Sequence, residues 1–190
     1  MRHFLISLVC LLSLSAHAAD VVLPVCDVPV RFVSQPMAEP VVDHSRSLAR
    51  LARIAEAEGA ARGIRLGHMA VDAQISIKPR SDCQGHDVKL AYADPVLRIA
   101  RELREGSCGY QHVLAHENTH VRMYQDMARE FAELTLPAGQ DENSALQYAA
   151  DQYNRLYARQ EQFDSSAEYA KNLTVCDGEI AQMLRSRARD

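Results

Sequence analysis

The stretch that most constrains this chain is His116-Glu117-Asn118-Thr119-His120, in which two histidines four residues apart flank a glutamate. On an α-helix, residues four apart lie on the same face, one above the other. Two imidazoles in this arrangement can bind one metal ion, and a glutamate beside the first histidine reaches toward an open coordination position. The motif therefore predicts a helix with a zinc site, in which His116 and His120 are ligands and Glu117 is the general base.

Residues 1–18 have the pattern of an export signal. A short basic start precedes the apolar run 4–14, and Ala16-His17-Ala18 supplies a cleavage site of small residues. The apolar run is too short to span a bilayer. We therefore expect a mature protein of one domain, residues 19–190, that is periplasmic or secreted and is not inserted in a membrane after cleavage.

The charge of the chain disfavours one class of partner. The formal net charge is −4 over 190 residues, so the chain lacks the excess of basic residues typical of proteins that bind nucleic acid or anionic membranes. We expect no nucleic-acid partner.

Four cysteines remain after removal of the signal: Cys26, Cys83, Cys108 and Cys176. An even number in an exported chain predicts two disulfides, for which three connectivities exist. The preferred pairing is Cys83–Cys108, joining a hairpin to the motif helix, with Cys26–Cys176 joining the two ends of the mature chain. A cysteine zinc site is disfavoured because no C-x-x-C spacing occurs.

Hydrophobic periodicity predicts an α+β fold that is mostly helical. A small antiparallel sheet or hairpin packs on the motif helix and on a following long helix. The predicted strands are 21–33, an edge strand containing prolines, and 71–78 and 88–92, which form a hairpin. The predicted helices are 43–59, 95–105, 110–134, one that begins after an N-cap at Asp141, and a frayed helix from Glu179. The hairpin could offer a free edge to an extended peptide, or it could be purely structural.

A catalytic zinc site needs a third protein ligand. Asp126 has the spacing of the third ligand in proteins with the pattern H-E-x-x-H-x-x-G-x-x-H/D. In that pattern the helix stops at the glycine and the chain turns, but this chain has Met123 at the glycine position. Glu142 lies on the apolar face of the second long helix, where a carboxylate is costly unless it is paired or bound to metal. Glu142 is therefore the preferred third ligand, and Asp151 is the fallback if the helical register differs.

Other polar side chains near the motif have less defined roles. His112 precedes His120 by two helical turns, about 12 Å, so both cannot reach one ion. An oxyanion formed during catalysis would need a hydrogen-bond donor. No spacing rule selects among the candidates, which are Tyr110, Tyr148, Tyr153, His68 and His86.

The motif, the preceding hairpin and the acidic residue on a following helix together resemble the zincin metallopeptidases, and most closely their gluzincin arrangement. The resemblance covers roughly residues 71–157, and its specific part is His116, Glu117 and His120. The layout is also similar to that of small bacterial secreted proteins predicted to be zinc proteases. Gluzincins often carry an aspartate four residues after the ligand glutamate, where this chain has Leu146.

The resemblance implies a zinc-dependent peptidase that hydrolyses a peptide or protein substrate. Zinc would lower the pKa of a bound water, and Glu117 would take its proton and pass it to the leaving amine. The alternative is an exported protein that binds a metal or a partner on a degenerate zincin scaffold and is not an enzyme. Zinc content and cleavage of a peptide library discriminate between these two functions.

Overall fold

The structure, a computed structural model, describes residues 22–58 and 63–187, and the expected signal peptide lies outside these residues. The strands are β1 (Val25–Ser34), β2 (Val41–Asp43), β3 (Gly67–Pro79) and β4 (Gln84–Ile99). The helices are α1 (Leu48–Ala57), α2 (Cys108–Ala132), α3 (Glu142–Phe163), α4 (Ser166–Lys171) and α5 (Glu179–Arg187), with a 3-10 turn η1 (Cys176–Gly178) before α5. The predicted α+β class is confirmed.

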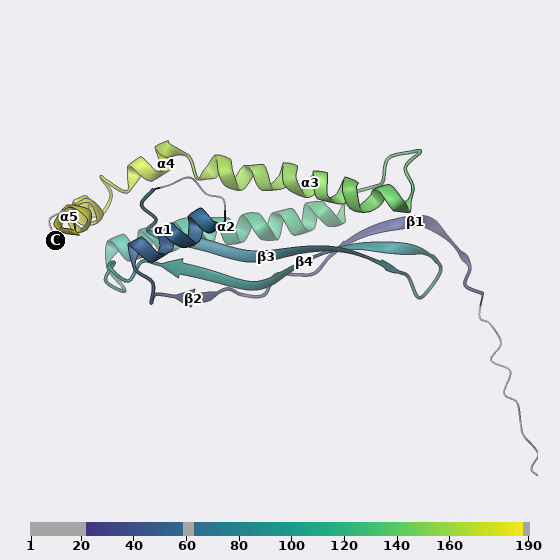
Figure 1. Ribbon diagram of the computed structural model, residues 1–190, viewed down its shortest axis with the longest axis horizontal. Coiled ribbons are helices and arrows are strands. Elements are labelled where there is room, and N and C mark those ends of the chain that lie inside the picture. Colours follow the sequence, from purple (N-terminus) through teal and green to yellow (C-terminus); the bar gives the residue numbers. More distant parts are fainter. Residues whose placement is uncertain (1–21, 59–62, 188–190) are drawn as a thin grey trace, which may run out of the picture.

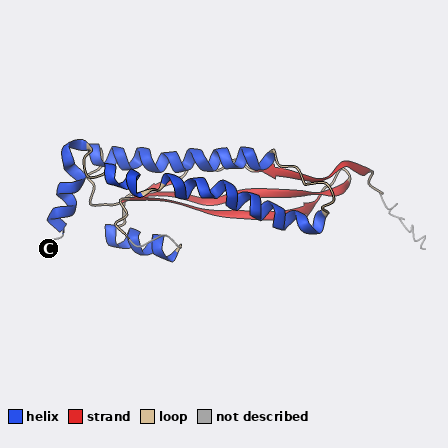
Figure 2. Ribbon diagram, turned by 90° about the horizontal axis from the view of Figure 1, so that it is seen from above, coloured by secondary structure: helices blue, strands red, loops and turns tan. Residues whose placement is uncertain are grey.

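The molecule is elongated, and α2 and α3 lie along one face of the sheet (Figure 1). The two helices run in opposite directions because the short loop between them turns the chain back. Seen from above, α2 and α3 lie side by side over the strands, and α1 lies to the side of them (Figure 2). Consequently the beginning of α2 is next to the end of α3.

The long strand β4 is the centre of the sheet. Strand β3 pairs with it in the antiparallel direction from Gly67↔Ile99 to Pro79↔His86, which confirms the predicted hairpin. Strands β1 and β2 both pair with β4 in the parallel direction, at successive parts of its length. The sheet is therefore mixed: the expected antiparallel pairing holds for β3 and β4, and it is wrong for β1 and β2, because the chain reaches β4 from each of these strands by a long connection and not by a tight turn.

Strand β4 continues through Pro95 to Ile99, where the sequence predicts a helix over 95–105. The pairing register shifts between Ala70 and Asp72 on β3, and Asp94 has a positive φ of 48°. Such a bulge accommodates a proline, which has no N–H to donate to the ladder. It also changes the alternation, so that Tyr92 and Leu97 are both buried on the side facing the helices.

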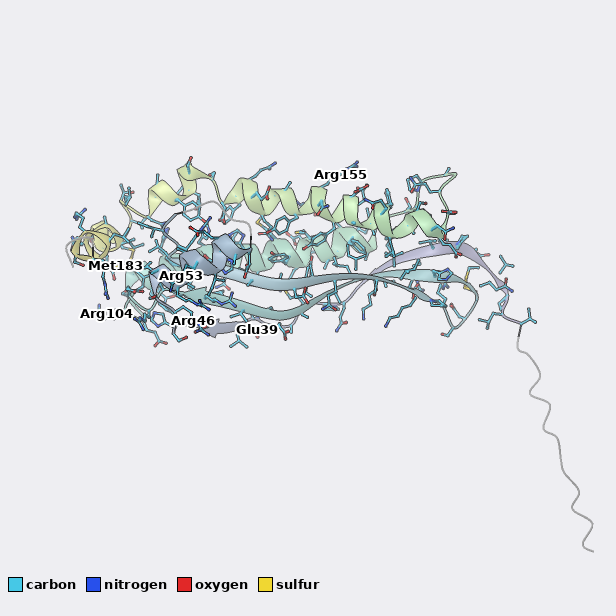
Figure 3. All side chains as sticks on the ribbon, viewed as in Figure 1. Glu39, Arg46, Arg53, Arg104, Arg155 and Met183 are labelled. Atoms are coloured by element: carbon cyan, nitrogen blue, oxygen red, sulfur yellow. A yellow bond between two sulfur atoms is a disulfide. The ribbon has the colours of Figure 1, made fainter. Side chains whose placement is uncertain are left out.

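The core lies between the sheet and the two long helices. Its fully buried side chains include Leu90 and Leu97 of β4 and Phe131 of α2, and Ala145 and Ala149 of α3 are also completely buried. Alanines at these positions allow α3 to pack closely on its neighbours. Charged side chains such as Arg155 project from the outer side of α3, away from the sheet (Figure 3).

Both long helices begin at a side-chain cap. The Ser107 hydroxyl accepts a hydrogen bond from the Tyr110 N–H at the start of α2. Asp141 caps α3, as predicted, and forms a reciprocal capping box with Ser144. These caps satisfy N–H groups that have no partner within the helix, and so they fix the residue at which each helix starts.

The disulfides join Cys26 to Cys83 and Cys108 to Cys176, with Cα separations of 5.2 Å and 5.6 Å. The predicted pairings, Cys83–Cys108 and Cys26–Cys176, are therefore wrong. The parallel pairing of β1 with β4 brings Val25 opposite Gln84 and so brings Cys26 beside Cys83. The turn η1 before α5 meets the start of α2, which brings Cys176 to Cys108.

Two disulfides fit a compartment more oxidising than the cytoplasm. Within the described ranges, every helix is too short or too polar to cross a lipid bilayer.

Replacing Cys108 and Cys176 together with serine should lower the free energy of unfolding by about 4 kcal/mol, because the crosslink spans 68 residues and restricts the unfolded chain. Urea denaturation of the oxidised wild type and the double variant measures this difference. A double variant as stable as the wild type would show that this crosslink does not stabilise the fold.

Candidate metal centre

Three side chains converge where the beginning of α2 meets the end of α3. Asp164 Oδ1 lies 3.1 Å from His116 Nε2 and 3.0 Å from His120 Nε2. All three donor atoms lie within 4.8 Å of one another. His116 and His120 are one turn apart on α2, as predicted, and Asp164 is the C-cap residue of α3.

The spacing of these donor atoms fits a small metal ion. Zinc binds nitrogen and oxygen at about 2.0–2.1 Å with tetrahedral angles, which places neighbouring ligand atoms about 3.3 Å apart. The observed separations of 3.0 and 3.1 Å require only a small adjustment. The side chain of Asp164 is 32% exposed, whereas those of His116 and His120 are 14% and 9% exposed. The group can therefore hold a metal ion with access from the Asp164 side.

Phe163 fixes the two imidazoles from the α3 side. Its ring stacks on His116 at a centroid distance of 4.7 Å and meets His120 edge-on at 5.2 Å. An aromatic wall of this kind limits rotation of both histidines and shields one side of the group from water. The same helix end thus supplies the acidic donor and the packing that orients the histidines.

Glu117 lies between α2 and β3, close enough to His116, His120 and Asp164 for their charges to act on its carboxylate, and is only 4% exposed. Burial raises the pKa of its carboxyl group to about 7, although the neighbouring His120 and His116 act in the opposite direction. The Met69 backbone N–H donates a hydrogen bond to the carboxylate. A carboxylate with a pKa close to neutrality can exchange a proton near pH 7, which is what the predicted general base requires.

Gly67 provides the space that Glu117 occupies. A Cβ atom at this position would collide with Glu117 Oε1 and would lie only 2.7 Å from Glu117 Cγ and from Val113 Cγ1. The absence of a side chain on β3 therefore allows the strand backbone to approach the carboxylate. This close approach is also what brings the Met69 N–H within hydrogen-bonding distance.

Replacing Gly67 with alanine should destabilise the fold by about 1–3 kcal/mol, because the new methyl group overpacks the site. It should also displace the Glu117 carboxylate. Thermal or urea denaturation measures the loss of stability. Gly63→Ala is the matched control, since a Cβ at Gly63 would have no neighbour within 4 Å. Equal stability of the two variants would contradict this packing.

Each histidine has a second polar neighbour at Nδ1. His120 Nδ1 faces the side-chain oxygen of Gln160, and His116 Nδ1 lies 3.9 Å from Glu168 Oε1. Burial lowers the pKa of His120, but the contacts with Asp164 and Gln160 outweigh this effect, so the net shift is upward. Gln160, Asp164 and Glu168 follow one another at intervals of four residues and surround the pair of imidazoles.

The second oxygen of Asp164 is close to a cation and a phenol. Arg65 Nη1 lies 3.7 Å from Asp164 Oδ2, and the Tyr169 hydroxyl shares hydrogen bonds with Asp164 and with Arg65. Although burial raises the pKa of Asp164, hydrogen bonds from His116 and His120 lower it strongly. Asp164 is therefore ionised at neutral pH, as a metal-binding carboxylate must be.

Glu142, the predicted third ligand, is not part of this group. Its carboxylate lies 2.6 Å from His86 Nδ1, at the opposite end of α3 from Asp164. The helix has 22 residues, which separates its two ends by about 33 Å. Ala145 and Ala149 are buried, as predicted for the apolar face of α3, but the Glu142 side chain is 54% exposed, so the predicted core-facing position of Glu142 is wrong.

Asp126 and Asp151, the other candidates for the third ligand, lie apart from the group as well, and so does His112, which is not expected to reach the ion. Asp126 pairs with Arg129 on the surface of α2, Asp151 accepts a hydrogen bond from Gln147, and His112 contacts Asn172. Among the proposed oxyanion donors, His68 pairs with Glu58 at 3.1 Å, while the rings of Tyr110 and Tyr148 pack against His44 and Phe32. Tyr153 stacks on Tyr157.

Sequence reasoning missed Asp164, Gln160, Phe163, Tyr169, Arg65 and Gly67. For Asp164 a signal existed, because the loop at Pro137 and Gly139 implies an antiparallel partner helix whose far end returns to the motif. Comparison with known proteins adds no further assignment: the chain matches no protein-family model, no curated protein and no solved structure at a significant level.

Proposed function

We propose that this protein is an exported zinc-dependent peptidase. The observation that carries the proposal is the convergence of His116 Nε2, His120 Nε2 and Asp164 Oδ1 above the buried carboxylate of Glu117. Two imidazoles and one carboxylate are a ligand set typical of zinc enzymes, which leave a fourth coordination position open. The two disulfides and the signal-like start support a location outside the cytoplasm.

In this proposal His116, His120 and Asp164 hold the metal, and zinc bound there supplies a Lewis acid that activates water and polarises a carbonyl group. Glu117 accepts the proton from the attacking water and donates it to the leaving amine. Burial suits the carboxylate for both steps, because it brings the pKa to about 7. The hydrogen bond from Met69 keeps the carboxylate aimed at the same place during proton transfer.

The substrate would be bound as an extended peptide beside β3. The edge of β3 that does not face β4 has no strand partner in the part of the chain that the structure describes. This strand also carries Gly67 and Met69, which contact Glu117. A peptide added to this edge would form main-chain hydrogen bonds and would pass close to the general base. The proposed reaction is therefore hydrolysis of a peptide bond in an extended segment.

The proposal is tested by incubating the purified mature protein with a mixed peptide library and identifying products by mass spectrometry. We expect cleavage that a zinc chelator abolishes and that added zinc restores. Protein that binds about one zinc ion per chain, as a three-ligand site predicts, but cleaves nothing in the library would contradict the peptidase. That result would favour an exported metal-binding protein.

A further inference from the structure

Gln160 is a buried polar residue whose amide group faces His120 and Met127. It lies on α3 one turn before Asp164 and is 4% exposed. Its Oε1 atom faces His120 Nδ1. Its Nε2 atom donates to the backbone carbonyl of His120 at 3.3 Å and points at Met127 Sδ at 3.9 Å. One side chain thus contacts both the imidazole and the backbone of the same histidine.

These contacts determine which way the amide is oriented. The backbone carbonyl of His120 and the thioether of Met127 are both acceptors, so the group that faces them must be the NH₂ of Gln160. The opposite orientation would direct the amide oxygen at another carbonyl oxygen and leave buried donors unpaired, which costs about 1–3 kcal/mol. The amide oxygen is therefore fixed against His120 Nδ1.

An amide oxygen can only accept a hydrogen bond, so His120 Nδ1 must carry a hydrogen. In neutral imidazole the lone pair is then on Nε2, the atom that lies 3.0 Å from Asp164 Oδ1. Metal-binding histidines commonly have such a partner at the second ring nitrogen, which fixes the tautomer and the orientation of the ring. Phe163 restricts the same ring from another side.

We propose that Gln160 is a positioning residue that presents Nε2 of His120 to the metal. This inference rests on the metal site of the proposed function. A neutral amide supplies the acceptor without adding charge to a pocket that already contains the carboxylates of Glu117 and Asp164. A leucine at this position roughly keeps the volume of the side chain but removes the acceptor.

The test compares zinc dissociation constants, measured by competition with a chromophoric chelator. Gln160→Leu should weaken zinc binding by about 10–100-fold, the usual cost of losing such a partner. Gln147→Leu is the matched control: Gln147 lies on the same helix but is exposed and hydrogen-bonded to Asp151, so its replacement should leave the affinity unchanged.

A second readout is the tautomer of His120 in the zinc-loaded protein, observed by nitrogen-15 NMR. The wild type should show a protonated Nδ1 held in a hydrogen bond, and Gln160→Leu should lose that hydrogen bond. If Gln160→Leu does not fold, Gln160→Met replaces it, because methionine has a similar length and no oxygen.

Wild-type affinity in Gln160→Leu would overturn the inference and leave the proposed function intact. Weakened binding in Gln160→Leu with the hydrogen bond at His120 Nδ1 retained would also overturn it, because the loss of the acceptor would then not be the cause. A wild type that binds no zinc would overturn both proposals, whereas tight zinc binding without peptide cleavage would overturn only the peptidase.

Discussion

Replacing Glu117 with glutamine should lower peptide hydrolysis by roughly 10²–10⁴-fold while leaving zinc bound, because a general base contributes rate enhancement of that order. Glutamine has nearly the same shape as glutamate but cannot accept the proton of the attacking water. It also fits a pocket in which Glu117 is 4% exposed and in which burial already favours the neutral form of the carboxyl group. The variant should therefore fold normally.

Rates of cleavage of one peptide, together with zinc content, measure this effect. Glu142→Gln is the matched control, because Glu142 is also a glutamate beside a histidine but lies at the far end of α3. It should retain wild-type activity. Full activity in Glu117→Gln would show that another group accepts the proton, and loss of zinc from that variant would show that Glu117 is a ligand.

Replacing Asp164 with alanine should weaken zinc binding by more than about 100-fold, because loss of a direct ligand exceeds the 10–100-fold cost of losing an outer partner. Peptide hydrolysis should fall with it at limiting zinc. Asp164 Oδ1 contacts both histidines, and among the described residues it is the carboxylate that groups with them at metal-binding distances. Zinc competition titrations measure the change in affinity.

Glu142→Ala is the control for this experiment, since it removes the carboxylate that the sequence favours as the third ligand. Its zinc affinity should equal that of the wild type. A loss of zinc in Glu142→Ala with no change in Asp164→Ala would instead support Glu142 as the third zinc ligand. That result would require a different packing of α3 on α2. Melting temperatures of both variants show whether either change disturbs the fold.

Elements with strong local signals could be predicted from the sequence. Alternation of apolar and polar residues in β3 identifies the strand, and Asp141 identifies the start of α3 because its side chain caps the helix. The motif itself identifies His116 and His120 as neighbours on one helix face. In each case the information lies within a few residues of the element that it determines.

Features that depend on distant parts of the chain could not be predicted in this way. Helical propensity after Pro95 competes with pairing of β4 to β2 and β3, and the long sheet ladder prevails. Disulfide connectivity depends on which strand lies beside Cys83, and the parallel partner β1 brings Cys26 there. Sequence spacing contains neither piece of information.

The carboxylate that joins His116 and His120 in the candidate metal centre could be predicted only in part. An angle around the helix selects the face of α3 but not the position along it, and so Glu142 and Asp164 could not be separated by angle alone. The position along the helix follows from the loop around Pro137 and Gly139, which makes α2 and α3 antiparallel. His116 and His120 occur early in α2, and their partner must therefore occur late in α3.

The most direct test of the metal centre is a crystal structure of the zinc-loaded protein with anomalous scattering measured at the zinc edge. We expect one anomalous peak about 2.0–2.2 Å from His116 Nε2, His120 Nε2 and a carboxylate oxygen of Asp164. A peak bound by His86 and Glu142, or zinc held by His116 and His120 with Asp164 turned away, would contradict it.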